Sequence, residues 1–353
     1  MPEPTPRILL AGAGSLVGVG ILHALQGRRE GVTLIGAGAD PFAYSMLQCD
    51  EQVVLPLTTD PAYRAALDDA AGRLRADLVI ACRDPDAIVV AQANDDPQSP
   101  VVAPTAPAPL VEMTRDKYET YLWCKAIDVP FVPSVATATA TSRAELAELV
   151  EEWGMPLITK PRAGSGSLGV RVLTEPSHVE ATVSQPGMIV QPYLEAPPAE
   201  SLQLDLSLGI PFFFEVPVDN GTTVMALIGR DGEIGPLCLH GVSQRLGRNE
   251  SLKRLHDERL LAAAMHATTR FRDAGWRGPL NMGFRHGHDR WWIFEVNPRF
   301  SGGTPGRLLL GYDEVGWVVN SWLGREVIPP YSGASGDRVV CYITNYVDPR
   351  PVG

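Results

Sequence analysis

The sequence predicts an α/β protein of two or three domains. Its 353 residues exceed the roughly 100–200 residues of one domain. Hydrophobic residues make up 45% of the chain and charged residues 20%, a composition typical of proteins that bury large cores. In the first hundred residues, short apolar segments alternate with segments of helical spacing. This alternation predicts a parallel sheet with right-handed crossovers.

The first domain is expected to begin with a strand over 7–11, a turn containing Gly12, Gly14 and Gly18, and a helix. Two explanations fit the glycines: a dinucleotide-binding turn with Asp40 near the ribose, or close packing of the helix on the strand. The spacing is one residue longer than the dinucleotide fingerprint, so we expect no nicotinamide cofactor. Further strands are expected at 32–36, 52–55, 77–81 and 101–103, with a helix over 62–74.

The middle of the chain combines lysines with a loop rich in glycine. A helix that includes Lys117 is expected to begin within residues 114–117, with Thr114 as its N-cap. Residues 163–169 hold three glycines and two serines, whose N–H and hydroxyl donors suit phosphate oxygens. A flexible hairpin turn would have the same composition, and no GKS or GKT follows as in a Walker A loop. Other elements are expected at 131–135 (strand), 144–153 (helix), 156–160 (strand ending in Lys160) and 188–195 (strand broken by proline).

The strongest local pattern is an apolar strand that leads into Glu295, Asn297 and Arg299. Alternation along a strand places Glu295 and Asn297 on one face. Both side chains offer the oxygen ligands that Mg²⁺ takes beside nucleotide phosphates, and Arg299 suits an anion. A solvated edge strand is the alternative, although an acid, an amide and an arginine on one face of an apolar strand favour a binding site.

In order and spacing, these motifs resemble those of the ATP-grasp superfamily, above all its carbamoyl-phosphate-synthase-like branch of carboxylate–amine ligases. The resemblance runs over most of the chain. It implies a Rossmann-like domain at 1–112, a two-lobed α+β ATP-grasp domain at 113–325 with a lid lobe at about 129–192, and a C-terminal extension at 326–353. It also implies ATP and Mg²⁺ (or Mn²⁺) as cofactors.

Carried over residue by residue, the resemblance assigns a role to each motif. Lys117 and Lys160 would contact ATP phosphates, Glu295 and Asn297 would hold the metal, and Arg299 would lie beside an acyl phosphate, with Lys160 and Arg299 as the catalytic residues. The remaining assignments are Gly164, Ser165, Gly166 and Ser167 to the phosphate loop, Gln191, Tyr193 and Leu194 to the adenine connection, and Glu200 to the ribose.

One position departs from the family pattern. Members usually carry another acidic or amide metal ligand one strand earlier, where this chain has Gly283. Asn281, two residues back on the same face, is a possible substitute. The alternatives are that Glu295 bridges two ions alone or that one ion binds weakly.

The resemblance implies a ligase that forms an amide bond through an acyl phosphate, with a small carboxylate and an amine as substrates. The alternatives are a non-catalytic ATP-binding protein and a kinase or carboxylase that activates a small acid such as bicarbonate. For the substrate we single out Arg245, Ser301, Gly302 and Gly303, although Arg245 and Arg248 fit a solvated loop equally well. His286 and His288 are expected at the surface of a hairpin turn, and residues 338–344 as one further strand.

Charge and cysteine content limit the partners. Lys and Arg number 30 against 41 Asp and Glu, a net charge of −11, so we expect neither nucleic acid nor an anionic membrane as a partner. No apolar run reaches the roughly 18 residues of a membrane span, and the first residues lack the form of a signal peptide. Five scattered cysteines without CxxC spacing indicate reduced thiols in a cytoplasmic protein. A homodimer is compatible with the family.

Overall fold

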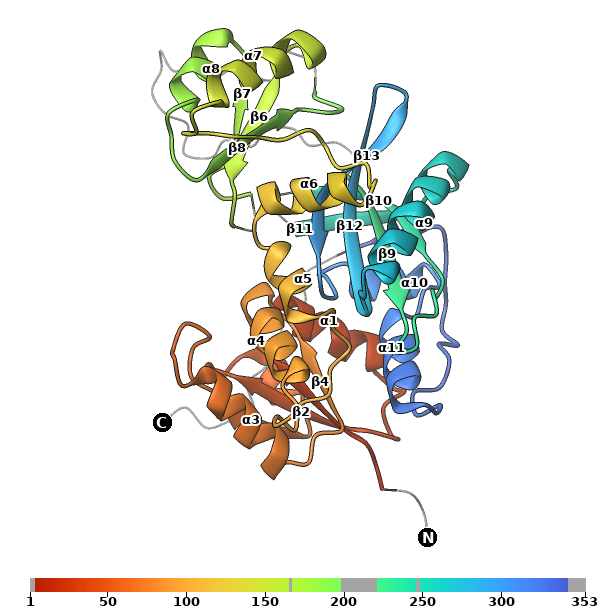
Figure 1. The fold of residues 1–353 in the computed structure, drawn as a ribbon. Coiled ribbons are helices and arrows are strands. Elements are labelled where there is room, and N and C mark those ends of the chain that lie inside the picture. Colours follow the sequence, from red (N-terminus) through yellow and green to blue (C-terminus); the bar gives the residue numbers. More distant parts are fainter. Residues whose placement is uncertain (1–3, 165–166, 198–220, 246–247, 342–353) are drawn as a thin grey trace, which may run out of the picture.

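The computed structural model describes residues 4–164, 167–197, 221–245 and 248–341. Three sheets follow one another along the molecule, with a six-stranded sheet between the sheet of the first domain and a small helix-covered sheet (Figure 1). Across these ranges, no helix has both the length and the apolar character that a bilayer crossing demands.

Four parallel strands form the first sheet in the order β3-β2-β1-β4, as the alternation of segments predicts. Side chains of β1 alternate between two cores: Ile8 and Leu10 pack on one face, Leu9 and Ala11 on the other. Both faces are therefore covered. The elements are β1 (Arg7–Ala11), α1 (Leu16–Leu25), β2 (Thr33–Gly38), α2 (Tyr44–Leu47), β3 (Glu51–Val54), α3 (Tyr63–Arg73), β4 (Leu78–Ala81), α4 (Asp84–Asp95) and α5 (Ala108–Met113).

The strand expected at 101–103 does not form. The N–H of Val79 donates to the C=O of Val102 at 2.8 Å, but the N–H of Ala103 donates to the side chain of Asn94 instead of to β4. Pro100 and Pro104 flank the segment and have no N–H to add to a ladder. The segment therefore runs beside the sheet without becoming part of it.

The small sheet has the antiparallel order β5-β8-β6-β7. Helices α7 and α8 cover the face that carries Leu157 and Val190. Because Lys160 pairs with Ile189 and Gln191 with Ile158, alternation places Lys160 and Gln191 together on the opposite face. The elements are α6 (Lys117–Ala126), β5 (Val135–Ala136), α7 (Ser142–Trp153), β6 (Leu157–Pro161), β7 (Arg171–Leu173), α8 (Pro176–Thr182) and β8 (Met188–Pro192).

The six-stranded sheet has the order β13-β12-β9-β10-β11-β14. One face packs on α9, and the other on α10, α11 and the first domain. Arg245 and Arg248, for which a solvated loop was one interpretation, are the last residue of β10 and the first of β11, and β14 confirms the first part of the expected C-terminal strand. The elements are β9 (Gly221–Ile228), β10 (Cys238–Arg245), β11 (Arg248–Arg254), α9 (Glu258–Asp273), β12 (Gly278–Gly287), β13 (Arg290–Asn297), α10 (Thr304–Leu309), α11 (Glu314–Leu323) and β14 (Arg338–Val340).

The first domain and the C-terminal helices share one hydrophobic core. Residues of α1 pack in the same cluster as Phe300 and Val318. At its edge, Arg28 forms a bidentate ion pair with Asp313 at 2.5 and 2.9 Å, and the indole N–H of Trp322 donates to Ala103 at 3.1 Å. Residues 300–322 are thereby packed against the first domain.

Two further local predictions were wrong. The helix expected to open under a Thr114 cap begins at Lys117 instead, because Asp116 accepts hydrogen bonds from the N–H groups of the first turn while Thr114 ends α5. The strand expected at 131–135 is reduced to Val135–Ala136, since Pro133 interrupts it, although Phe131 still forms a bridge to β13.

Candidate active site

A small hollow, open to solvent, lies where α6, the loop after β6 and the end of β13 meet. It brings together four residues singled out in the sequence: Lys117, Gly164, Glu295 and Asn297. Its lining residues are Thr114, Arg115, Lys117, Thr120, Phe131, Gly164, Glu295, Val296 and Asn297.

Lys117 reaches the hollow from the first position of α6. Its N–H donates to the C=O of Arg162 at 3.0 Å, and its ammonium donates to the C=O of Gly164 at 3.1 Å. The guanidinium of Arg162 in turn pairs with Asp116, at 2.7 Å. Partial burial lowers the pKa of Lys117, while the nearby charge of Glu295 acts in the opposite direction. The start of α6 and the glycine loop are thus held together.

Lys160 approaches from the small sheet. It is 8% exposed, and its ammonium donates to the C=O of Phe294 at 3.3 Å and lies 5.5 Å from the centre of the Phe294 ring. Burial lowers its pKa to about 8, against the opposing attraction of Glu295 and with further lowering by Lys117. The two lysines and Glu295 are therefore near enough to influence one another electrostatically.

A bulge shapes the strand that carries Glu295 and Asn297. The register of β12 with β13 shifts so that Gly283 faces Glu295 while Phe284 faces Ile293, which leaves Phe294 as the extra residue. Ile293 and Val296 can then both pack in the core behind the strand. Among the described residues, neither the Glu295 carboxylate nor the Asn297 amide has a hydrogen-bond or ion-pair partner, so their oxygens are available.

The ring of the bulged residue Phe294 fills the space that a side chain at position 283 would need. A side chain at position 283 would begin with a Cβ only 2.7 Å from the Phe294 ring. The space beside Glu295 on the neighbouring strand is therefore filled by an aromatic ring, and no oxygen ligand stands there. Lys160 and Arg285 lie over this ring at 5.5 and 5.8 Å.

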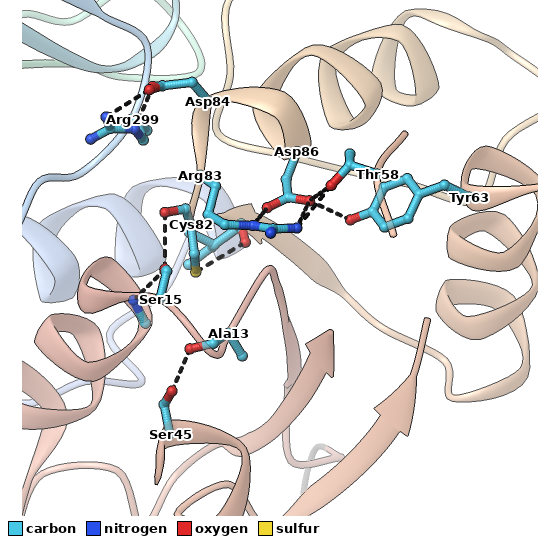
Figure 2. A network of polar contacts seen from close by, with 12 residues as sticks. Ala13, Ser15, Ser45, Thr58, Tyr63, Cys82, Arg83, Asp84, Asp86 and Arg299 are labelled. Atoms are coloured by element: carbon cyan, nitrogen blue, oxygen red, sulfur yellow. Dashed lines mark hydrogen bonds and ion pairs between the residues drawn. The ribbon is translucent and has the colours of Figure 1, made fainter. Parts of the chain in front are cut away.

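Arg299 is held from the first domain. Its guanidinium donates two hydrogen bonds to Asp84, at 2.5 and 2.9 Å (Figure 2). It donates a third to the C=O of Phe300 at 2.9 Å. Asp84 opens α4 and also pairs with Arg115, which lines the hollow, at 3.5 Å. One buried carboxylate thus connects the end of the β13 strand with the α5–α6 connection.

The glycine turn of the first domain is occupied by its own side chains. Gly12 has a φ of +76°, and a Cβ at this residue would overlap the carboxylate of Asp86. Asp86 is fully buried and accepts hydrogen bonds from Arg83 at 2.6 and 2.9 Å and from Tyr63 at 2.7 Å (Figure 2). The turn is packed against this buried Arg83–Asp86 ion pair, which fits the packing explanation for the glycines.

The predicted adenine connection follows β8. Gln191 is buried, and its amide N–H donates to Ser134 at 2.7 Å. Tyr193 is half-buried, which raises its pKa, and Leu194 is buried against Trp292. Gln191 lies on the face of the small sheet that carries Lys160. Whether Gln191, Tyr193 and Leu194 contact adenine stays a prediction.

The phosphate loop and the ribose acid lie partly outside the described residues. Ser165, Gly166 and Glu200 belong to that part. Gly164 has a φ of +149°, which favours glycine, and Ser167 is exposed with a φ of +58°.

The predicted substrate residues separate into two groups. Arg245 ends β10, and its side chain lies outside the described part. Ser301, Gly302 and Gly303 lie between β13 and α10, where the Ser301 hydroxyl accepts from Arg307 at 3.0 Å. Arg307 is itself buried in a bidentate pair with Glu314, so this segment is tied into the protein interior.

His286 and His288 lie at the hairpin between β12 and β13, as expected, but they are not simply solvated. The exposed ring of His288 stacks on Trp153 of α7 with centroids 3.8 Å apart, and half-buried His286 contacts Trp291 edge to face. The hairpin therefore touches the small-sheet lobe.

Sequence reasoning missed Asp84, Arg115 and Phe294. A signal existed for Asp84, because Asp-Pro-Asp before an apolar segment is typical of a helix start. Arg115 and Phe294 had none, since their positions depend on how α5 meets α6 and on the bulge.

Solved structures of other proteins share the fold of this chain. The biotin carboxylase domain of a Hydrogenobacter thermophilus 2-oxoglutarate carboxylase, a dimer in complex with MgADP, ADP and bicarbonate, has 15% identity and a TM-score of 0.67, with 95% of this chain and 72% of that chain covered. N5-carboxyaminoimidazole synthetase from Staphylococcus aureus, complexed with ADP, has 12% identity and a TM-score of 0.67, covering 95% and 80%. The N5-carboxyaminoimidazole ribonucleotide synthetase from Thermus thermophilus has 17% identity and a TM-score of 0.65, covering 93% and 80%.

The chain therefore has the ATP-grasp fold, as the order of its motifs predicts. Within this fold, residues 116–191 match the family model of the carbamoyl-phosphate synthase L chain, ATP binding domain. That segment runs from the cap of α6 to the end of β8 and includes Lys117, Lys160 and the glycine loop.

Proposed function

We propose that the protein is an ATP-dependent carboxylate–amine ligase that forms an amide bond through an acyl phosphate and releases ADP and phosphate. One observation carries the proposal: Lys117 and Glu295, from distant segments, line one solvent-open hollow, and the buried ammonium of Lys160 lies near enough to both to interact with them electrostatically. Two cations beside a free carboxylate suit a magnesium nucleotide, whose phosphates need the cations and whose metal needs the carboxylate.

The residues fit a divalent cation. Glu295 and Asn297 supply hard oxygen atoms, and within the described chain those oxygens have no other partner. Glu295 and Asn297 would hold the ion, which would neutralise charge on the transferred phosphoryl group.

In the proposed reaction, a carboxylate oxygen of the substrate attacks the γ-phosphorus of ATP, and the bond to the β,γ-bridging oxygen breaks to release ADP. An amine then attacks the acyl carbon, loses a proton, and phosphate leaves. Lys117 and Lys160 would bind phosphate oxygens and offset their charge. Arg299, oriented by Asp84, would bind the acid or the acyl phosphate. The 163–169 loop would exclude water, which would otherwise hydrolyse the acyl phosphate.

Two other functions have a specific observation in their favour. Bicarbonate is present in the complex of the Hydrogenobacter thermophilus biotin carboxylase domain, which motivates a carboxylase that activates bicarbonate. Gly283, with no oxygen beside Glu295, motivates a nucleotide-binding protein without turnover. We prefer the ligase because Arg299 and the two lysines supply the cations that both steps need.

The test is phosphate release from ATP with a panel of amino acids and amines, and separately with bicarbonate. Amine-dependent ADP formation, with an amide product detected by mass spectrometry, would support the ligase. Release with bicarbonate alone would favour the carboxylase, and MgADP binding without any turnover would favour the non-catalytic protein.

The Glu295→Gln variant links the activity to the site. It is nearly isosteric and removes a charge that would hold the cation, so we expect turnover to fall at least about a hundredfold with folding unchanged. Glu152→Gln, at an exposed position of α7, is the matched control and should be neutral. Full activity of Glu295→Gln would remove Glu295 from the site.

A further inference from the structure

Asn281, in the middle of β12, carries a buried oxygen without a partner. The residue is 8% exposed, and its Oδ1 accepts no hydrogen bond from any described group. A buried polar atom in this state costs about 1–3 kcal/mol, and native proteins keep few of them. An amide oxygen is an acceptor only, so a proton donor or a cation would satisfy it.

The strand register places this oxygen beside the candidate cation site. Asn281 stands directly opposite Asn297, and Gly283 directly opposite Glu295. Residues in register on antiparallel strands point to the same face, with Cβ atoms roughly 4.5–5.5 Å apart. Leu280 and Met282 pack in the core on the other face, which fixes the orientation of Asn281.

No described neighbour of Asn281 donates a hydrogen bond to its Oδ1, the Asn297 amide opposite included. Its neighbour two residues along β12 on the same face is Gly283, whose side-chain space is filled by the Phe294 ring. On the other side, β9 places the apolar Met225 opposite Asn281. Glu295, diagonally across, is an acceptor when ionised. The amide oxygens of Asn281 and Asn297 and the carboxylate of Glu295 thus lie on one face with no hydrogen bond formed to Asn281 Oδ1, an arrangement that suits a cation.

We propose that Asn281 is a third oxygen ligand of the divalent-cation site formed with Glu295 and Asn297. The proposal rests on the proposed function, because it deepens the same nucleotide site. It places the ion toward the Asn281–Asn297 pair, away from the position that Phe294 closes at Gly283. A site with one acid and two amides should bind the free ion weakly and tolerate one cation better than two.

The experiment is a titration of the full-length protein with Mn²⁺ alone, followed by the electron paramagnetic resonance of the free ion. Asn281→Leu preserves approximate size and removes the oxygen, and we expect Mn²⁺ affinity to fall at least about tenfold. Asn281→Asp adds a charge and should bind Mn²⁺ more tightly. Glu295→Gln tests the site itself and should lose Mn²⁺ binding.

The outcomes separate the two proposals. If Asn281→Leu and Asn281→Asp both bind Mn²⁺ like the unchanged protein while Glu295→Gln does not, the inference is overturned and the proposed function stands. If Glu295→Gln also binds Mn²⁺ like the unchanged protein, the assignment of the metal site to Glu295 is wrong. Thermal unfolding in EDTA checks folding: Asn281→Leu should melt no lower than the unchanged protein, because it removes an unsatisfied group. Should it fail to fold, Asn281→Asp alone decides.

Discussion

Replacing Lys160 by methionine should raise the free energy of unfolding of the protein. The same replacement should weaken nucleotide binding at the proposed site. Burial lowers the pKa of Lys160 from 10.5 to about 8. At 1.36 kcal/mol per pKa unit, keeping this lysine charged in the folded protein at pH 7 costs about 3 kcal/mol. Methionine keeps the apolar stem but loses the hydrogen bond to Phe294, worth about 1 kcal/mol. We therefore expect Lys160→Met to raise the free energy of unfolding by about 2 kcal/mol.

The pH dependence gives this prediction its sign. The unfolded chain binds the Lys160 proton more tightly than the folded protein, so the cost of the buried charge is complete below about pH 8. It declines between about pH 8 and the unfolded pKa of 10.5. The contribution of the charge at pH 9.5 should be less than half of that at pH 7.

Urea unfolding without nucleotide, at pH 7 and pH 9.5, measures both values. Lys253→Met removes an exposed lysine of β11 and serves as the control. The reasoning is refuted if Lys160→Met is less stable than the unchanged protein at pH 7, or if its advantage does not shrink at pH 9.5. The same variant should bind ADP weakly, because the cation that the proposal places on the phosphates is gone.

Three further predictions concern buried charges and the glycine turn. Asp84→Asn should lower turnover at least about tenfold with ADP affinity unchanged, since Arg299 loses its ionic partner; equal losses of both would contradict a positioning role. Arg307→Met leaves the buried Glu314 uncompensated and should cost about 3–5 kcal/mol in urea unfolding, partly recovered by adding Glu314→Gln; a neutral single variant would count against the pair. Gly12→Ala should lower the melting temperature, because a left-handed φ costs about 1–3 kcal/mol and the new methyl overlaps a buried carboxylate; an unchanged melting temperature would show that the turn adapts.

Much of the fold could be predicted because local chemistry decided it. The apolar segments of the first domain, with their two-residue alternation, predict β1 to β4 and the order of their helices. Lys160 at the end of an apolar strand and Glu295 with Asn297 on one face follow from the same alternation. Of the residues singled out in the sequence, Lys117, Gly164, Glu295 and Asn297 come together at the hollow.

The features of the fold and the site that could not be predicted depend on contacts between segments far apart in the sequence. The bulge at Phe294 changes which side chains of β13 share a face. No residue type in β13 indicates that a bulge will form. The competition between Thr114 and Asp116 for the cap is decided by where α5 ends. The clamp of Asp84 on Arg299 joins residues far apart in the chain and could be found only once the domains were packed.

Because α1 shares a core with Phe300 and Val318, the boundary expected near residue 113 does not separate two independent folding units. A fragment beginning there would leave this apolar surface in water and the guanidinium of Arg299 without its counter-ion. Proteases should accordingly find no cleavable linker at that point. Heating should melt the first sheet and the C-terminal helices together, in a single calorimetric peak.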